Sequence, residues 1–177
     1  HVQAARAMTV LARLRRLVPP RVTAAVLRTW YNGWCTTRRF QSHSPCRFGC
    51  RLGEDSVDHY MRCSRLHGDG KSALRLQVSR DMGLRAVQFL LLEPAAALPD
   101  ATLTRRALHL AAAYRLHCHC RRELPIISDD VLARALGQAT KEAAMGHAKA
   151  LQVLDSTWVS KANPNRDRSY EGPGVII

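Results

Sequence analysis

Three cysteines and one histidine within the first 65 residues of the 177-residue chain have the types and spacing of a metal site. They follow the pattern C-x3-C-x8-H-x3-C and are Cys46, Cys50, His59 and Cys63. Three thiolates and one imidazole suit tetrahedral Zn²⁺, and four protein ligands make a site structural because no position is left for water. His59 and Cys63 are four residues apart and share one helix face. We therefore predict a structural zinc knuckle, although its spacing is not the retroviral C-x2-C-x4-H-x4-C; the alternative is three core cysteines and a hydrogen-bonded histidine.

A second group of potential ligands is continuous in the sequence and comprises His117, Cys118, His119 and Cys120. Adjacent residues on a helix point in different directions, so within this group only His117 and Cys120 could share an ion. The simpler interpretation, which we favour, is a helix end with cysteines facing the core and histidines facing solvent. Whether the group binds a second metal stays open. Cys35 is expected in the core.

Arginine dominates the charge of the chain, which has 27 Lys+Arg against 14 Asp+Glu and a formal net charge of +13. Residues 1–53 contain ten arginines and no acidic residue. Because a guanidinium binds phosphate through paired hydrogen bonds and stacks on bases, nucleic acid is the expected partner, ahead of an acidic membrane surface. A codon-usage bias toward arginine is the alternative. The predicted contacts are Arg13, Arg15, Arg16, Arg21, Arg28, Arg38, Arg39, Arg47, Arg51 and Arg62.

Four aromatic residues, Trp30, Tyr31, Trp34 and Phe40, are interleaved with these arginines. They could stack on unpaired bases or pack in the core. We favour the core, with the arginines pointing outward.

The elements that position these residues are predicted to be helices, because apolar residues recur at helical spacing and no alternating strand pattern occurs. The expected helices are 3–18, 20–34, 57–66, 71–82, 84–92, 101–122 and 128–151. The fold class is all-α, with a loop–helix zinc knuckle and a disordered or extended basic tail. We divide the chain into arginine-rich helices with the zinc module (1–68), a helical domain (69–154) and the tail (155–177).

Composition excludes several classes. No apolar run reaches the roughly 18 to 20 residues of a membrane span. Six cysteines among 177 residues are too few for a disulfide scaffold. The acid-free, arginine-rich opening is typical both of the end of an organelle transit peptide and of an amphipathic helix facing RNA. On the first interpretation we expect a mitochondrial location, and otherwise an intracellular one.

One segment resembles a known family. Residues 30–41 read WYNGWCTTRRFQ, residues 46–50 read CRFGC, and residues 55–63 read DSVDHYMRC. They resemble the region C-terminal to the polymerase in reverse transcriptases of non-LTR retroelements, notably those of dinoflagellate-type protists. The match covers roughly residues 20–66, and the helices at 71–122 fit only loosely. The resemblance implies a helical, zinc-binding module that contacts nucleic acid. The chain lacks the aromatic-Ala-Asp-Asp strand and the endonuclease signature of these enzymes, so their chemistry is not implied.

The function expected from the sequence is that of a non-catalytic RNA-binding protein, a structural component of a ribonucleoprotein such as an organellar ribosome. Zinc is the expected cofactor, and RNA, in particular rRNA, and neighbouring proteins are the expected partners. One alternative is the C-terminal nucleic-acid-binding segment of an active retroelement polymerase. Another is a protein–protein adaptor that docks through the apolar helices of 84–116.

Overall fold

The computed structural model describes residues 2–50, 53–68, 76, 78–94, 98–121 and 128–162. Its helices are α1 (Val2–Leu17), α2 (Pro20–Trp30), α3 (Val57–Tyr60), α4 (Met82–Phe89), α5 (Asp100–Cys120), α6 (Asp129–Ala144) and α7 (Ala148–Ala162), with a 3₁₀ turn η1 (Arg38–Phe40). The only strand-like pairing in this part of the chain is an isolated bridge between Pro45 and Glu54. The all-α prediction is confirmed. None of the described helices has the length and apolar character needed to cross a membrane.

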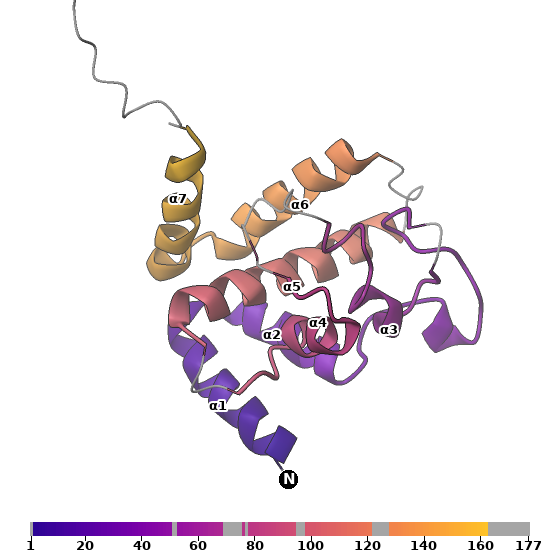
Figure 1. Cartoon of the computed structure of the whole chain (residues 1–177), viewed down its shortest axis with the longest axis horizontal. Coiled ribbons are helices and arrows are strands. Elements are labelled where there is room, and N and C mark those ends of the chain that lie inside the picture. Colours follow the sequence, from indigo (N-terminus) through magenta and orange to yellow (C-terminus); the bar gives the residue numbers. More distant parts are fainter. Residues whose placement is uncertain are drawn as a thin grey trace, which may run out of the picture.

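Helix α5 is the centre of the molecule. It runs through the middle of the view in Figure 1 and contacts α1, α2, α4, α6 and α7. Its buried residues lie on all sides of the helix, among them Leu103, Leu108, Leu110 and Leu116. A helix that is apolar around most of its circumference must be covered by other elements. The long apolar stretch of the sequence therefore becomes the element on which the others pack.

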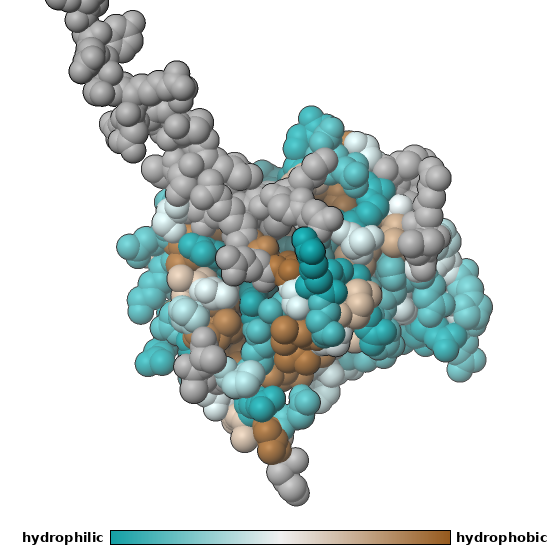
Figure 2. All heavy atoms as spheres, viewed as in Figure 1, coloured by the Kyte–Doolittle hydropathy of each residue, from teal (hydrophilic) through white to brown (hydrophobic). Residues whose placement is uncertain are grey.

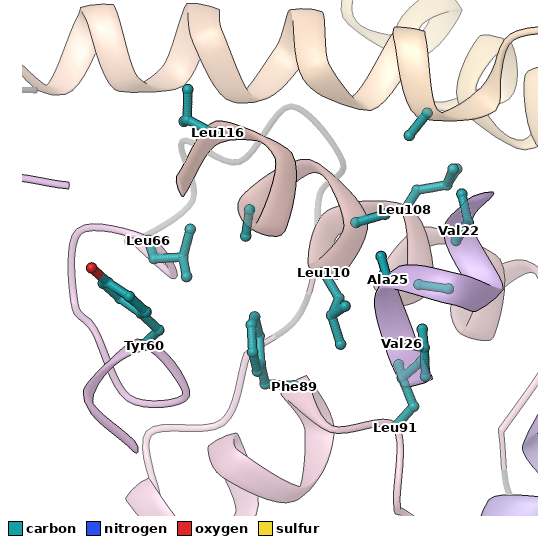
Figure 3. Close-up of a cluster of buried hydrophobic side chains, with 14 of the residues drawn as sticks. Val22, Ala25, Val26, Tyr60, Leu66, Phe89, Leu91, Leu108, Leu110 and Leu116 are labelled. Carbon is teal, nitrogen blue, oxygen red and sulfur yellow. The ribbon is translucent and has the colours of Figure 1, made fainter. Parts of the chain in front are cut away.

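The core is continuous along the chain. In Figure 3, Val22 and Val26 of α2 point toward the leucines of α5, with Leu91 beside Val26. Tyr60 and Leu66, near the predicted metal site, lie on the other side of Phe89. Burying a valine, leucine or phenylalanine side chain stabilises a fold by about 1.5 to 3 kcal/mol. The cluster of buried residues extends from Val10 to Leu154, so the stretches 1–68 and 69–154 share one core.

One patch of apolar side chains stays on the surface. Met82 and Leu84 of α4 are 49% and 45% exposed. Figure 2 shows hydrophobic surface gathered over α4 and the segment beside it.

The predicted helix 57–66 is shorter in the structure: α3 ends at Tyr60, so Cys63 follows the helix and does not share a helix face with His59. Two other helix ends differ from the prediction for local reasons. Helix α2 ends at Trp30 because Asn32 has a left-handed φ of 50° and the N–H of Gly33 bonds the carbonyl of Arg28. The predicted helix 128–151 is divided at Gly146, whose φ of 76° suits glycine. Helix α7 then continues past residue 155, where the tail was expected to begin. The C-terminal residues 163–177 and half of the predicted helix 71–82 lie outside the described residues. The prediction is wrong for residues 78–81, which are not helical.

Two of the arginines predicted to bind nucleic acid make contacts between helices. Arg13 bonds the carboxylate of Asp100, at the start of α5, at 2.6 Å and the carbonyl of Leu98 at 2.6 Å. Arg21 donates to the carbonyls of Ala143, at 3.1 Å, and Met145. These carbonyls lie at the end of α6, where carbonyls lack intrahelical partners and the helix dipole is negative.

Replacing Arg21 with methionine should therefore destabilise the protein. We expect the free energy of unfolding to fall by about 1 to 2 kcal/mol, because two carbonyls lose a charged donor. Urea unfolding followed by circular dichroism measures the change. Arg134→Met, at an exposed position of α6, is the matched control and should leave the midpoint unchanged. Equal midpoints for both variants would contradict the role assigned to Arg21.

Candidate metal centre

Three of the four predicted ligands converge on one point. The ligand atoms of Cys46, His59 and Cys63 all lie within 4.8 Å of one another, and the two sulfurs are 3.9 Å apart. Two sulfurs bound to one tetrahedral Zn²⁺ at about 2.3 Å would be separated by about 3.8 Å. Nε2 of His59 is buried and has no hydrogen-bond partner. The group could therefore hold a metal ion.

Cys50, the fourth predicted ligand, lies outside this group. Its side chain is buried, with 6% exposed. Its sulfur is not within 4.8 Å of all three ligand atoms. Three members of the predicted set are thus together, and Cys50 as a ligand stays a prediction.

The sulfur of Cys46 is prepared to be a thiolate. A hydrogen bond from Cys63 lowers the pKa of Cys46 to about 5 against the opposing effect of burial, helped by His59 and the N–H groups of Cys50 and Phe48. The same bond raises the pKa of Cys63. Because the thiolate is the form that binds metal, the loop already stabilises the required state at one ligand.

Local backbone structure explains how residues so far apart in the sequence meet. Gly49, with a φ of 75°, turns the chain and donates to the carbonyl of Cys46 at 3.0 Å. The N–H of Cys46 in turn bonds the carbonyl of Gly53 at 2.9 Å. Ser56 caps α3 by accepting the N–H of His59 at 3.1 Å. The two halves of the centre are thus joined through backbone hydrogen bonds.

Gly53 is required by space. A Cβ placed on it would lie 2.0 Å from Cε1 and Nδ1 of the His59 imidazole. The ring therefore packs directly on the backbone of Gly53, a contact that the sequence pattern did not reveal.

Gly53→Ala should displace His59 and weaken metal binding by about one to two orders of magnitude, a loss typical when the positioning of a ligand is disturbed. Competition with a chromogenic zinc chelator measures the affinity. Gly68→Ala is the control, because an added Cβ there meets nothing closer than 3.4 Å. Wild-type affinity in Gly53→Ala would exclude His59 from the ligand set.

Asp55 connects the centre to the rest of the fold. Its side chain is fully buried. It accepts hydrogen bonds from the hydroxyl of Tyr60 at 2.6 Å, the N–H of Thr37 at 2.9 Å and Nε2 of His117 at 2.9 Å. Nε of Arg47 lies 3.7 Å from the carboxylate. Burial alone would raise the pKa of Asp55, but the bonds from His117, Tyr60 and Thr37 outweigh it and lower it to about 2. The carboxylate is therefore charged.

His117 corrects the interpretation of the second cluster. The prediction that both histidines of this cluster face solvent is wrong for His117, which is fully buried against Asp55, and holds for the exposed His119. Cys120 is buried and Cys118 is half-buried. Among the described residues, the Cys46, His59 and Cys63 group is the one set of three or more such side chains close enough to share an ion.

The aromatic residues divide between core and surface. Trp34 is fully buried, 5.2 Å from His117 and 5.5 Å from Tyr60 between ring centroids. Trp30 is half-buried and donates to the carbonyl of Leu90 at 2.7 Å. The preference for the core is wrong for Tyr31 and Phe40, whose exposed fractions are 82% and 65%. Cys35 is also partly exposed rather than in the core.

The predicted nucleic-acid contacts divide in the same way. The exposed arginines are Arg15, Arg16, Arg28, Arg38, Arg39 and Arg62, together with Arg21, which is exposed although it also bonds the end of α6. Arg13, Arg21 and Arg47 make the internal contacts described above, and Arg51 lies outside the described residues. Arg65, which sequence reasoning missed, lies 2.8 Å from the carboxylate of Asp129 on α6 and bonds the carbonyl of Gly49 at 3.2 Å. It joins the loop that carries the candidate metal ligands, residues 44–63 (the metal loop), to α6.

No protein-family model, curated protein or solved structure matches this chain. The geometry itself therefore defines the class: an all-α protein with a Cys/His cluster that could bind a metal ion.

The Asp55–His117 pair gives stability a defined pH dependence. The pKa of Asp55 is lowered from 3.8 to about 2. Asp55 therefore stabilises the fold at pH values above 3.8, and this contribution is lost as the pH falls toward about 2. Burial lowers the pKa of His117, but the bond to Asp55 outweighs it and raises this pKa above 6.5. His117 therefore stabilises the fold below pH 6.5, and this contribution is lost as the pH rises through the raised pKa. The pair therefore stabilises most between about pH 4 and 6.5.

Asp55→Asn should lower the free energy of unfolding of the zinc-loaded protein by about 3 kcal/mol at pH 6, because His117 loses its charged partner. The difference from wild type should shrink as pH rises to 9. Urea titrations across this range measure it, with Asp58→Asn, an exposed acidic position on α3, as the control. A difference that grows with pH would contradict the pairing.

Proposed function

We propose that this chain is a non-catalytic RNA-binding module in which a zinc ion and Asp55 hold an arginine-bearing surface in place. The observation that carries the proposal is the attachment of η1 to the metal loop. The N–H of Arg38 bonds the backbone carbonyl of Asp55 at 3.3 Å, and the N–H of Thr37 bonds its carboxylate. The same Asp55 is fixed to the loop through its N–H, which bonds Ser44 at 2.8 Å.

The side chains on η1 suit phosphate and unpaired bases. Arg38 and Arg39 are exposed, and the contact of Arg38 with Glu54 is long at 3.8 Å. Such a surface pair contributes little and leaves the guanidinium available. Phe40 completes the turn with its ring exposed. Because unstacked RNA bases bind on aromatic rings beside arginine, this turn supports contact with a single-stranded RNA segment.

Further arginines are exposed on other elements. Arg15 and Arg16 occupy the last turn of α1, and Arg62 follows α3. Phosphate contacts from such residues give affinity without sequence specificity. They support a partner such as rRNA, with neighbouring proteins, inside a ribonucleoprotein; a mitochondrial ribosome is our specific proposal. The resemblance of residues 20–66 equally supports an origin in a retroelement polymerase, whose nucleic-acid-binding segment is the alternative.

A second candidate, the protein–protein adaptor, is favoured by one observation. A groove of about 650 Å³ is open between α1, α2 and α3 and is lined mainly by apolar side chains, including Met8, Leu11, Trp30 and Leu92. The apolar helices within 84–116, which the sequence suggests as the docking surface of an adaptor, supply much of the core. Co-purification with a protein but no nucleic acid, after nuclease treatment, would favour the adaptor.

Binding to a structured RNA with a single-stranded loop tests the proposal. We expect affinity to fall by at least about tenfold between 50 and 200 mM salt, because phosphate contacts release counterions. Replacing Arg38 and Arg39 with alanine should weaken binding by about tenfold. It should also reduce the steepness of the plot of log affinity against log salt concentration by about two. Fluorescence anisotropy measures both quantities.

The matched control is the double variant Arg80→Ala and Arg134→Ala, which removes the same charge from exposed positions outside the metal loop. It should retain most of the affinity. Equal losses for both double variants would mean that only net charge matters, and salt-independent binding would contradict the proposal altogether.

A further inference from the structure

The groove between α1, α2 and α3 is open to solvent and has a volume of about 650 Å³. Its first wall is one face of α1, on which Ala4, Met8 and Leu11 recur at helical spacing. Its second wall comes from the end of α2 and the turn after α3, where Trp30 and Met61 line the same space. Because both walls are mainly apolar, a partner with an apolar surface gains free energy by displacing water from the groove.

Helix α1 has a second apolar face that the fold leaves exposed. Its buried residues, Val10, Leu14 and Leu17, all lie in the second half of the helix. In Figure 1 the first turns of α1 extend away from α5. Met8 lines the groove and is 67% exposed. A helix with apolar residues on two faces requires cover on both. The groove face of α1 therefore lacks a partner in the part of the chain that the structure describes.

The walls of the groove favour a helix as its occupant. An extended peptide binds by adding a strand to the edge of a sheet. The described residues offer no such edge, since their one strand-like pairing is the bridge between Pro45 and Glu54. The indole N–H of Trp30 already bonds the carbonyl of Leu90, at 2.7 Å, so its ring presents an apolar surface. A helix satisfies its own backbone hydrogen bonds and buries only side chains, and residues 3–11 of α1 rise about 12 Å, enough for about two turns of a partner.

The charges around the groove favour an acidic partner. Helix α1 carries four arginines and α2 carries two, and neither helix contains an acidic residue. Arg15 continues the groove face one turn beyond Leu11, Arg62 follows Met61 in the second wall, and both arginines are exposed. Asp58 is the acidic residue of the lining and marks a place where the partner carries a neutral or basic side chain. A second copy of this chain, with its formal charge of +13, would be repelled.

We propose that this groove binds an amphipathic helix of a partner protein, with acidic residues beside its apolar stripe. The apolar stripe packs on Met8, Leu11 and Trp30, and the flanking carboxylates lie near Arg15 and Arg62. The apolar contact supplies affinity, and the charges select the partner and its orientation. This docking site goes beyond the RNA contact proposed for η1 and does not depend on it, because no residue of η1 lines the groove.

Three labelled peptides test the proposal. Two share the same helical leucine stripe, flanked by glutamates in one and by lysines in the other, and the third has the composition of the glutamate peptide in scrambled order. Fluorescence anisotropy follows their titration with the full chain purified with zinc. We expect the glutamate peptide to bind at least about tenfold more tightly than either of the others. Equal binding of the glutamate and scrambled peptides, or tighter binding of the lysine peptide, would overturn the proposal.

Met8→Glu locates the binding site. It places a negative charge in the groove at an exposed position, and it should weaken binding of the glutamate peptide by at least about tenfold because the new carboxylate is desolvated and repels the glutamates. Met82→Glu makes the same change of charge on α4, outside the groove, where the side chain is 49% exposed. This control should keep the affinity within about twofold, because the charge of an exposed side chain is screened by salt. Equal affinities of the two variants would contradict binding in the groove.

Two further measurements separate this occupant from RNA and from a second copy of the chain. Met8→Glu and Met82→Glu should bind single-stranded RNA equally, and a loss of RNA affinity in Met8→Glu alone would assign the groove to nucleic acid. In sedimentation velocity, a wild-type dimer that Met8→Glu dissociates would assign it to a second copy. Either result overturns the proposal. A wild-type chain that binds the glutamate peptide but no RNA would contradict only the RNA-binding function.

Discussion

The buried carboxylate of Asp55 is the interaction on which the arrangement of the molecule depends. A charge without solvent is costly unless hydrogen bonds replace its hydration. Here the bonds come from three places: the chain before η1, the short helix α3, and the far end of α5. None of these segments can move away without leaving a charge unpaired. The carboxylate therefore fixes the metal loop on α5, while the leucines of α5 bury the apolar sides of α1 and α2.

Arginine has two roles in this fold, which differ in the contacts that the side chain makes. Arg21 bonds the carbonyls at the end of α6, and Arg13 and Arg65 bond the carboxylates of the first residues of α5 and α6. The arginines on η1 and on the last turn of α1 are exposed. The formal charge of +13 is therefore not one uniform surface. Part of it holds the helices together, and the part around the metal loop is presented to solvent in an orientation that the loop determines.

Spacing in the sequence was sufficient where the structure is local. The apolar period of α5 follows from helix geometry and was predicted from it. The meeting of His59 and Cys63 was also predicted, but Cys63 lies beyond the end of α3 at Tyr60, so a turn and not a shared helix face brings them together. The contact of Asp55 with His117 joins residues 62 positions apart, and no periodic pattern marks it. The need for a glycine at position 53 depends on the neighbouring ring of His59. The break between α6 and α7 depends on the backbone angle of Gly146. An acidic residue just before the Ser56 cap, inside a Cys/His pattern, was the signal available for Asp55.

The central claim is that Cys46, His59 and Cys63 hold one metal ion that orders the arginine-bearing loop. Native mass spectrometry of the chain purified with zinc tests it most directly. The account predicts one zinc per chain in the wild type, and none in Cys46→Ser under the same conditions. A wild-type chain that folds with the same helix content but carries no zinc, or a Cys46→Ser variant that keeps the ion, would contradict it.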